Sequence, residues 1–274
     1  MPQVPFKRIS SRDNALFKQA TRLAASARAR REQGAALLDG PHLVTAYHAA
    51  GGVAETLLVS ESGYGRPEIR RLFEHSAARA RALLSDRLFA EIAQVVEPVG
   101  LLALIRTPAP SAPPSAPGTC VLLDGIQDPG NLGSLLRSAA AAGVRHVFLS
   151  KGCVFAWAPM GLRAGQGAHF ALALHEHAPL EEIARAYAGT VATTAARGGV
   201  SLFEADLRGP VAWIFGSEGA GVSPALAAVA ALSVRIPMPG AAESLNVAAA
   251  AAVCLFEQAR QQRSGALSTP AARA

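Results

Sequence analysis

The sequence is poor in aromatic residues and in cysteine. Only 5% of its 274 residues are Phe, Trp or Tyr, so a core must be built mainly from Ala, Leu and Val. The three cysteines, Cys120, Cys153 and Cys254, form no CxxC pair, which argues against a disulfide scaffold and against a zinc site. We therefore expect each to be a small buried hydrophobic residue in a reducing, cytoplasmic environment.

Long hydrophobic runs are also missing. The longest apolar stretch, residues 247–256, is too short to span a bilayer, and the first 20 residues lack the apolar segment of a signal peptide. We expect no membrane partner. The patterns GxGxxG and GxxxxGK[ST] are absent too, which argues against a nucleotide-dependent oxidoreductase on an ordinary Rossmann sheet and against a P-loop.

Positive charge is present but uneven. The formal net charge is +6, and residues 1–107 hold 15 Lys+Arg against 10 Asp+Glu, whereas residues 108–274 hold 11 against 10. A basic N-terminal segment suits a polyanion, most commonly a nucleic acid, although a solvated basic helix without a partner has the same composition. The candidate nucleic-acid-binding residues, interpreted as RNA-binding below, are Lys7, Arg8, Arg12, Lys18 and Arg22.

A linker rich in Pro, Ala and Ser divides the chain. It covers residues 108–118 and is expected to be extended and semi-rigid. We predict an N-terminal domain over residues 1–107, a second domain over 119–265 and a flexible tail over 266–274.

Both parts of the chain alternate between helices and strands. In the first part the predicted helices cover 13–33, 41–50 and 66–80, and the predicted strands 36–40, 55–60 and 99–105. In the second part short apolar runs bounded by Gly and Pro predict strands at 121–126, 146–150, 171–175, 190–194, 211–215 and 233–236. Helices are predicted between them at 132–143, 157–165, 179–188, 223–231 and 244–262. This order indicates a mostly parallel α/β sheet with ligands bound at the carboxyl ends of its strands.

Three loops follow predicted strands of the second part. In the first, Asn131 stands where a helix needs an N-cap, and Arg137 lies two turns further on, where it is either exposed or ready to grip a phosphate. The second loop, residues 216–221, has three glycines that let the backbone approach a ligand. In the third, Ser244 and Asn246 precede a long apolar helix, and capping explains only one of them.

Together these loops resemble the SpoU family of the SPOUT superfamily of RNA methyltransferases. The similarity lies in DGIQDPGNLGSLLRSAAAAGV (124–144), IFGSEGAGVS (214–223) and IPMPGAAESLNVAAAAAV (236–253), in this order. The first part is similar, less specifically, to the RNA substrate-binding domain that precedes the catalytic domain in many members and resembles ribosomal proteins. Its matching pieces are ISSRDNALFK (9–18), LLDGPHLV (37–44) and EPVGLLALI (97–105).

The resemblance implies a C-terminal sheet tied in a trefoil knot, a homodimer formed through that domain, and S-adenosylmethionine as cofactor. It implies a catalytic set of Asn131, Arg137, Glu218, Ser244 and Asn246. The implied cofactor-binding set is Thr193, Thr194, Gly216, Ser217, Glu218, Gly219, Ile236, Pro237, Met238, Ser244 and Leu245. No metal is implied, and the scattered histidines, which lack carboxylate or Cys partners, are interpreted as structural or exposed.

The implied reaction moves a methyl group to a ribose 2′-hydroxyl. Because guanidinium keeps its proton in proteins, we prefer Arg137 as an electrostatic clamp rather than as a base, with Glu218 orienting it or taking part in proton removal. The two-domain layout favours ribosomal RNA as substrate. A tRNA substrate, and a non-catalytic RNA-binding protein that retains the fold, are the alternatives.

Overall fold

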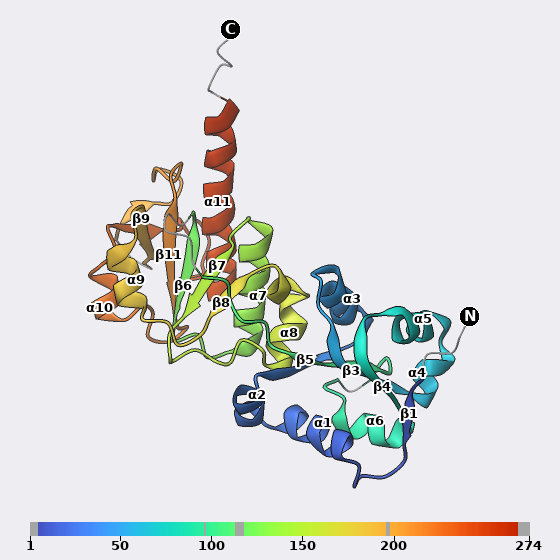
Figure 1. Ribbon diagram of the computed structural model, residues 1–274. Coiled ribbons are helices and arrows are strands. Elements are labelled where there is room, and N and C mark those ends of the chain that lie inside the picture. Colours follow the sequence, from blue (N-terminus) through green and yellow to red (C-terminus); the bar gives the residue numbers. More distant parts are fainter. Residues whose placement is uncertain (1–4, 96, 113–117, 196–197, 268–274) are drawn as a thin grey trace. The chain divides into compact units, whose positions relative to one another are not determined.

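Contacts within the chain divide it into two α/β units, one mainly blue to green and one mostly green to red in Figure 1. The structure is a computed structural model and describes residues 5–95, 97–112, 118–195 and 198–267, with side chains to residue 263. Unit 1 comprises residues 1–108 and 157–170, and unit 2 comprises 109–156 and 171–274. The predicted linker lies partly, and the predicted tail mostly, outside the described residues.

Unit 1 is built on a five-stranded mixed sheet. Strands β1, β4 and β3 are parallel, whereas β5 and β2 continue the sheet in antiparallel pairs. The order is β1 (Lys7–Ile9), β4 (Ala78–Leu84), β3 (Ala54–Ser60), β5 (Leu101–Arg106) and β2 (Ala35–Asp39). The helices around it are α1 (Ala15–Ala25), α2 (Ala27–Gln33), α3 (Pro41–Ala49), α4 (Glu61–Gly65), α5 (Pro67–His75) and α6 (Asp86–Ile92).

Two predictions for unit 1 were wrong in detail. The helix predicted over 13–33 is interrupted at Ser26, which is extended, donates its N–H to Arg22 O at the end of α1 and caps α2 through its hydroxyl. The helix predicted over 66–80 ends at His75, and residues 78–84 form β4. Strands β1 and β4 and helix α6 were not predicted.

Unit 2 has a seven-stranded sheet in which every pair of neighbouring strands is parallel. This sheet confirms the prediction of a mostly parallel α/β fold. Its order is β10 (Val200–Ser201), β12 (Leu232–Arg235), β9 (Thr190–Thr194), β11 (Val211–Gly216), β6 (Cys120–Asp124), β7 (His146–Leu149) and β8 (Ala173–His175).

Helices cover both faces of this sheet. On one face α7 (Pro129–Ala141) packs against the long α11 (Val247–Leu267) (Figure 1). On the other, α9 (Leu180–Ala186) and α10 (Pro224–Ala227) pack on a buried cluster that includes Leu122, Ile214 and Leu226. Burial of both faces explains why the central strands are apolar throughout.

The connection between β7 and β8 groups with unit 1. Its residues 157–170 contain α8 (Pro159–Gly165) and a short 3-10 turn (Ala168–Phe170), and α8 packs on β2. Phe170 lies 5.1 Å from Tyr47, ring centre to ring centre. Unit 1 is therefore built from two separate stretches of the chain. Among the described helices, none is both long and apolar enough to cross a membrane.

Candidate active site

The predicted loops meet at the carboxyl ends of the strands of unit 2. Gly216, the last residue of β11, is in register with Asp124, the last residue of β6. The backbone N–H of Ser223 donates to Asp124 Oδ2 at 2.9 Å. The loop after β6 is thereby joined to the loop after β11.

Asn131 lies in the first turn of α7, and Asp128 caps that helix. The Asp128 carboxylate accepts the backbone N–H of Asn131 at 2.7 Å, and Pro129 occupies the first helical position. The interpretation of Asn131 as a simple N-cap is therefore wrong. Its side chain is available for other contacts.

A chain of three polar side chains crosses the site. Asn246 Nδ2 donates to Asn131 Oδ1 at 2.8 Å, and Asn131 Nδ2 donates to Glu218 Oε1 at 2.5 Å. Asn246 also caps α11, because its Oδ1 accepts the backbone N–H groups of Ala248 at 2.9 Å and Ala249 at 3.3 Å. The three residues thus form one directed series of hydrogen bonds that ends on a carboxylate. Asn131 is 87 positions from Glu218 and 115 positions from Asn246 in the sequence.

The glycine loop is closed by its own backbone. Ser217 and Gly221 exchange N–H···O bonds of 3.0 and 2.9 Å, and Gly221 has a φ of +68°. A Cβ at Gly216 would lie 2.1 Å from the Gly221 backbone, so a side chain there breaks the loop. At Gly219 a Cβ meets nothing within 4 Å, which leaves that side of the loop open to a ligand.

A pocket of about 130 Å³ adjoins the polar series at the ends of β9 and β12. Five predicted cofactor-binding residues line it, and so do Ala195, Glu243 and Ala250, which sequence reasoning missed. Ala250 lies one helical turn after Asn246, and this spacing was the available signal. The five are Thr194, Ile236, Met238, Ser244 and Leu245.

The other predicted cofactor residues lie elsewhere. Thr193 alternates with Thr194 along β9 and pairs with Ile214, whose side chain packs in the cluster under α9 and α10. The hydroxyl of Thr193 is buried and has no hydrogen-bond partner among the described residues. Pro237 and the loop residues Gly216, Ser217, Glu218 and Gly219 do not line this pocket.

Two larger cavities lie away from the polar series. One, of about 350 Å³, lies between Asp124, Ser150 and the start of α9, and the other, of about 370 Å³, lies against Gln258 on α11. Size alone would select these cavities. The pocket of about 130 Å³ is the stronger candidate for the cofactor site, because its lining residues Ser244 and Leu245 immediately precede Asn246 in the sequence.

Arg137 is exposed on α7, two turns beyond Asn131. Its guanidinium has no hydrogen bond or ion pair to the described part of the chain. It is therefore not held within the polar series. An exposed guanidinium without an intramolecular partner is available to an anionic ligand.

The five predicted RNA-binding residues do not form one uncompensated cluster. Arg12 pairs with Glu91, Lys18 with Asp13 at 2.9 Å, and Arg22 approaches Glu32 at 3.9 Å. Lys7 and Arg8, exposed on β1, have no ion pair to any described residue.

No group of three or more His, Cys, Asp or Glu side chains arranged to hold a metal occurs in the described ranges. The strand histidines His146 and His175 contact each other, Nδ1 to Nε2, at 3.2 Å. Burial lowers the pKa of both rings. Both side chains are half-buried on the neighbouring strands β7 and β8.

Known proteins are similar to this chain in both sequence and fold. A Synechocystis protein named as an uncharacterized tRNA/rRNA methyltransferase is 35% identical over 96% of each chain. The 23S rRNA (guanosine(2553)-2′-O)-methyltransferase RlmP of Bacillus subtilis is 32% identical over 80% of this chain and 86% of its own.

The solved SpoU methyltransferase AviRb of Streptomyces viridochromogenes, in complex with the cofactor AdoMet, superimposes with a TM-score of 0.82 and 28% identity. The match covers 92% of this chain and 99% of that one. The model of the SpoU rRNA methylase family matches residues 118–256, which contain all three loops. The chain therefore belongs to the SpoU rRNA methylase family.

Proposed function

We propose that this protein is an RNA methyltransferase that uses S-adenosylmethionine to methylate a ribose 2′-hydroxyl, in ribosomal RNA. The observation that carries this proposal is the series Asn246–Asn131–Glu218 beside a small pocket at the carboxyl ends of a parallel sheet. The relatives support it, since RlmP is named as a 23S rRNA 2′-O-methyltransferase and the AviRb structure contains AdoMet.

The residues at the pocket suit the cofactor. Apolar walls from Ile236, Met238 and Leu245 suit an adenine ring, and the hydroxyls of Thr194 and Ser244 suit its polar edges. The volume accommodates only part of such a ligand, so we assign the remainder to the open side of the loop 216–219. When bound, S-adenosylmethionine supplies a methyl group on a sulfonium, which is already a good leaving group.

The protein must align the hydroxyl and assist loss of its proton. Asn246 donates to the Asn131 carbonyl oxygen and thereby turns the Asn131 NH₂ toward Glu218. The Glu218 side chain accepts this bond through Oε1 and keeps further lone pairs for a hydroxyl hydrogen. We assign to Glu218 the orientation of the hydroxyl and its proton, and to Ser244 a supporting role.

We assign to Arg137 the electrostatic clamp on the target phosphate and on the developing alkoxide. It is exposed and lacks a partner among the described side chains, which leaves its planar fork available for two-point contact. Lysine keeps the charge but not the fork. The test is tritiated methyl transfer to RNA by Arg137→Lys, for which we expect a loss of about 10- to 100-fold in rate with unchanged cofactor affinity. Wild-type turnover would contradict the clamp.

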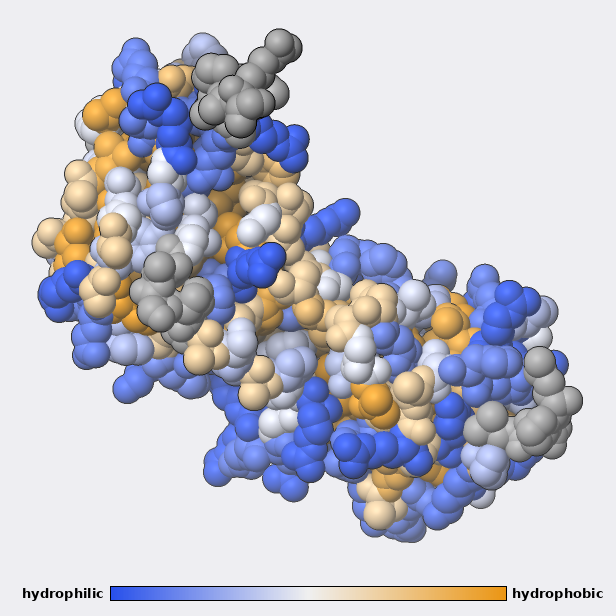
Figure 2. All heavy atoms as spheres, turned by 45° about the horizontal axis from the view of Figure 1, so that its top comes forward, coloured by the Kyte–Doolittle hydropathy of each residue, from blue (hydrophilic) through white to orange (hydrophobic). Residues whose placement is uncertain are grey.

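Unit 1 is proposed as the RNA substrate-binding domain, with a fold like that of RNA-binding ribosomal proteins, and unit 2 as the catalytic domain. The uneven charge along the sequence supports this division. On the face shown in Figure 2, unit 1 is mainly hydrophilic, whereas unit 2 exposes more apolar atoms.

Unit 2 is proposed to form the homodimer and to contain the trefoil knot. We assign α11, on which Phe256 is 51% exposed, to that interface. The knot is supported by the path of the chain, which leaves β11, enters β12 on the far side of β9, and returns as α11 to pack on α7. Three buried free cysteines support a cytoplasmic location.

A further inference from the structure

A buried glutamine on α11 contacts three different parts of unit 2. Gln258 is only 2% exposed. Its Oε1 accepts the indole N–H of Trp213 at 2.7 Å, and its Nε2 donates to Thr119 Oγ1 at 2.8 Å and to Gly209 O at 3.0 Å. Both amide hydrogens and the carbonyl oxygen are therefore used.

The partners of Gln258 lie on the elements that lead into the active site. Thr119 immediately precedes β6, whose carboxyl end continues into the loop and helix of Asn131. Trp213 lies in β11, which ends two residues before Glu218. Gln258 itself belongs to α11, which starts directly after Asn246. One side chain thus joins the three elements that carry the polar series.

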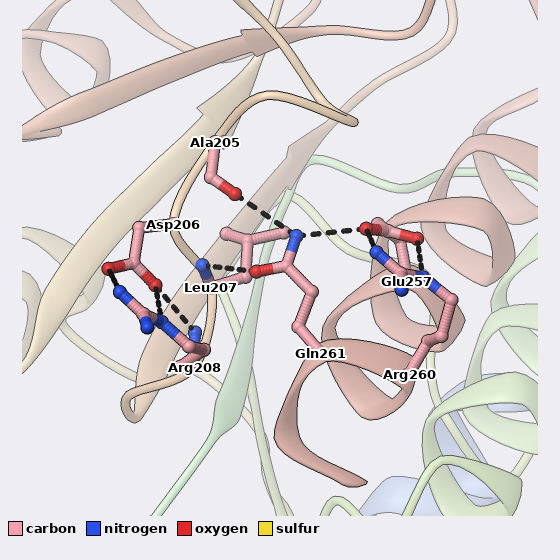
Figure 3. A network of polar contacts seen from close by, with 7 residues as sticks. All are labelled: Ala205, Asp206, Leu207, Arg208, Glu257, Arg260 and Gln261. Atoms are coloured by element: carbon pink, nitrogen blue, oxygen red, sulfur yellow. Dashed lines mark hydrogen bonds and ion pairs between the residues drawn. The ribbon is translucent and has the colours of Figure 1, made fainter. Parts of the chain in front are cut away.

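Neighbouring contacts strengthen the same junction. Gln261, one turn further along α11, accepts the N–H of Leu207 at 2.9 Å and donates to Ala205 O at 3.0 Å and to Glu257 (Figure 3). The segment before β11 is therefore bonded to α11 over residues 205–209.

Toward the described part of the chain, the first turns of α11 make such directional contacts only through Asn246, which caps the helix and donates to Asn131. Residues 248–252 are all alanine, and small side chains interdigitate little with a neighbouring helix. Apolar packing on α7 is non-directional. The hydrogen bonds of Gln258 add directional contacts that fix the rotation and the axial position of α11.

We propose that Gln258 is a positioning residue for the reaction: it fixes the rotation and the axial position of α11 so that Asn246 meets Asn131. The inference rests on the proposed function of the Asn246–Asn131–Glu218 series. Gln258 lies 12 residues from Asn246, about 18 Å along the helix. A small rotation of α11 at Gln258 therefore displaces the amide of Asn246. A misplacement of about 1 Å is enough to lower turnover by up to roughly 100-fold.

The test compares two glutamines on the same helix in the full-length protein. Gln258→Met removes the buried amide but keeps the length of the side chain. Gln262→Met is the matched control, because Gln262 is exposed and makes only a 3.3 Å bond to Gly209 O. Rates of methyl transfer to ribosomal RNA from cells lacking the gene are measured with both substrates saturating, and S-adenosylmethionine affinity is measured by calorimetry.

We expect kcat to fall about tenfold in Gln258→Met, with cofactor affinity changed less than threefold, because Thr194, Ile236 and Met238 are not bonded to Gln258. Gln262→Met keeps wild-type kcat. Equal kcat in the two variants, or a loss explained by cofactor affinity, overturns the proposal.

A double-mutant cycle separates positioning from loss of stability. Asn246→Ser still caps α11 but cannot reach Asn131, so the effect of Gln258→Met on kcat should largely disappear in that background. Additive losses overturn the inference. If Asn246→Ser alone keeps full kcat, the proposed function of the series fails instead. If Gln258→Met does not fold, Thr119→Val takes its place in the double-mutant cycle. This variant removes one hydroxyl that Gln258 contacts, and kcat should fall about threefold.

Discussion

At the scale of single residues, the direction of each hydrogen bond fixes how the side chains of the candidate site are oriented. Asn131 is the middle member of the series, so its amide has one orientation, with the oxygen toward Asn246 and the nitrogen toward Glu218. The sequence predicted that these three residues belong together, through the family resemblance. It did not predict the order of donors, because that order depends on Asp128, rather than Asn131, capping α7.

Asn131→Asp tests this order. The substitution keeps the shape and the acceptor for Asn246, but it places a second carboxylate against Glu218, where like charges repel. We expect methyl transfer to fall by about 100-fold or more while cofactor affinity is retained. Asn14→Asp, the same change at the N-cap of α1, serves as the control and should keep wild-type activity. Full activity in Asn131→Asp would mean that the series is not part of the site.

The cysteines provide a second prediction at this scale. Burial raises the pKa of Cys120 and of Cys254 to about 12, and burial also raises that of Cys153. Only about one thiol in 10⁴ with such a pKa is ionised at pH 8. The native protein should therefore leave a thiol-specific disulfide reagent unreacted at pH 8, and the denatured protein should release three equivalents. Fast release of one equivalent from the native protein would show an accessible thiol.

At the scale of elements, apolar periodicity found the strands of unit 2 well and the elements of unit 1 less well. The central strands β6 and β11 are buried on both faces and therefore read as short continuous apolar runs. Strand β4 begins ARAR, and its first two arginines are partly solvated, so the run resembled the end of a helix. The break at Ser26 was missed because serine is tolerated in helices as well as at their caps.

The pH dependence of stability is expected to involve α11. Hydrogen bonds from Arg260, and secondarily from Gln261, lower the pKa of Glu257 from its ordinary value of 4.5. A carboxyl whose pKa is lower in the folded state stabilises the fold above about pH 4.5, and this stabilisation is lost as the pH falls through the lowered value.

Glu257→Gln should therefore reduce the loss in free energy of unfolding between pH 6 and pH 3 by up to about 1 kcal/mol, measured by urea denaturation. Glu181→Gln is the control, because its pair with Arg185 is more exposed and should change that loss less. An unchanged pH profile in Glu257→Gln would contradict the account.

At the scale of the whole molecule, the excess of positive charge lies in the first part of the sequence, residues 1–107. Net charge predicted a basic first part, but it did not reveal that Arg12, Lys18 and Arg22 each lie near a carboxylate of the same unit. Nor did it reveal that residues 157–170, within the predicted catalytic domain, group with unit 1. The Arg12–Glu91 pair and the grouping of residues 157–170 depend on contacts between residues far apart in the sequence, which local patterns do not contain. The Lys18–Asp13 pair joins residues only five positions apart, and a net charge does not show which neighbouring charges are paired.

The double variant Lys7→Glu/Arg8→Glu tests RNA binding by unit 1. Both residues are exposed on β1 without an ion pair to the described chain, so both charges are free to meet phosphates. RNA affinity should fall. The plot of the logarithm of the RNA association constant against the logarithm of the salt concentration should become shallower, its negative slope losing about 2 in magnitude, because two phosphate contacts are lost. Arg12→Gln, whose guanidinium is engaged by Glu91, should have a smaller effect. An unchanged slope in the double variant would place the RNA contact elsewhere.

Methylation of a ribose is tested most directly by the position of the transferred methyl group. RNA from cells lacking the gene is incubated with the purified full-length protein and S-adenosylmethionine carrying a deuterated methyl group, then digested to nucleosides and analysed by mass spectrometry. We expect the label on the ribose, in a single 2′-O-methylated nucleoside from ribosomal RNA, and we expect its loss in Asn131→Asp. Label on a base, or unlabelled RNA despite bound cofactor, would show that the protein does not catalyse ribose methylation.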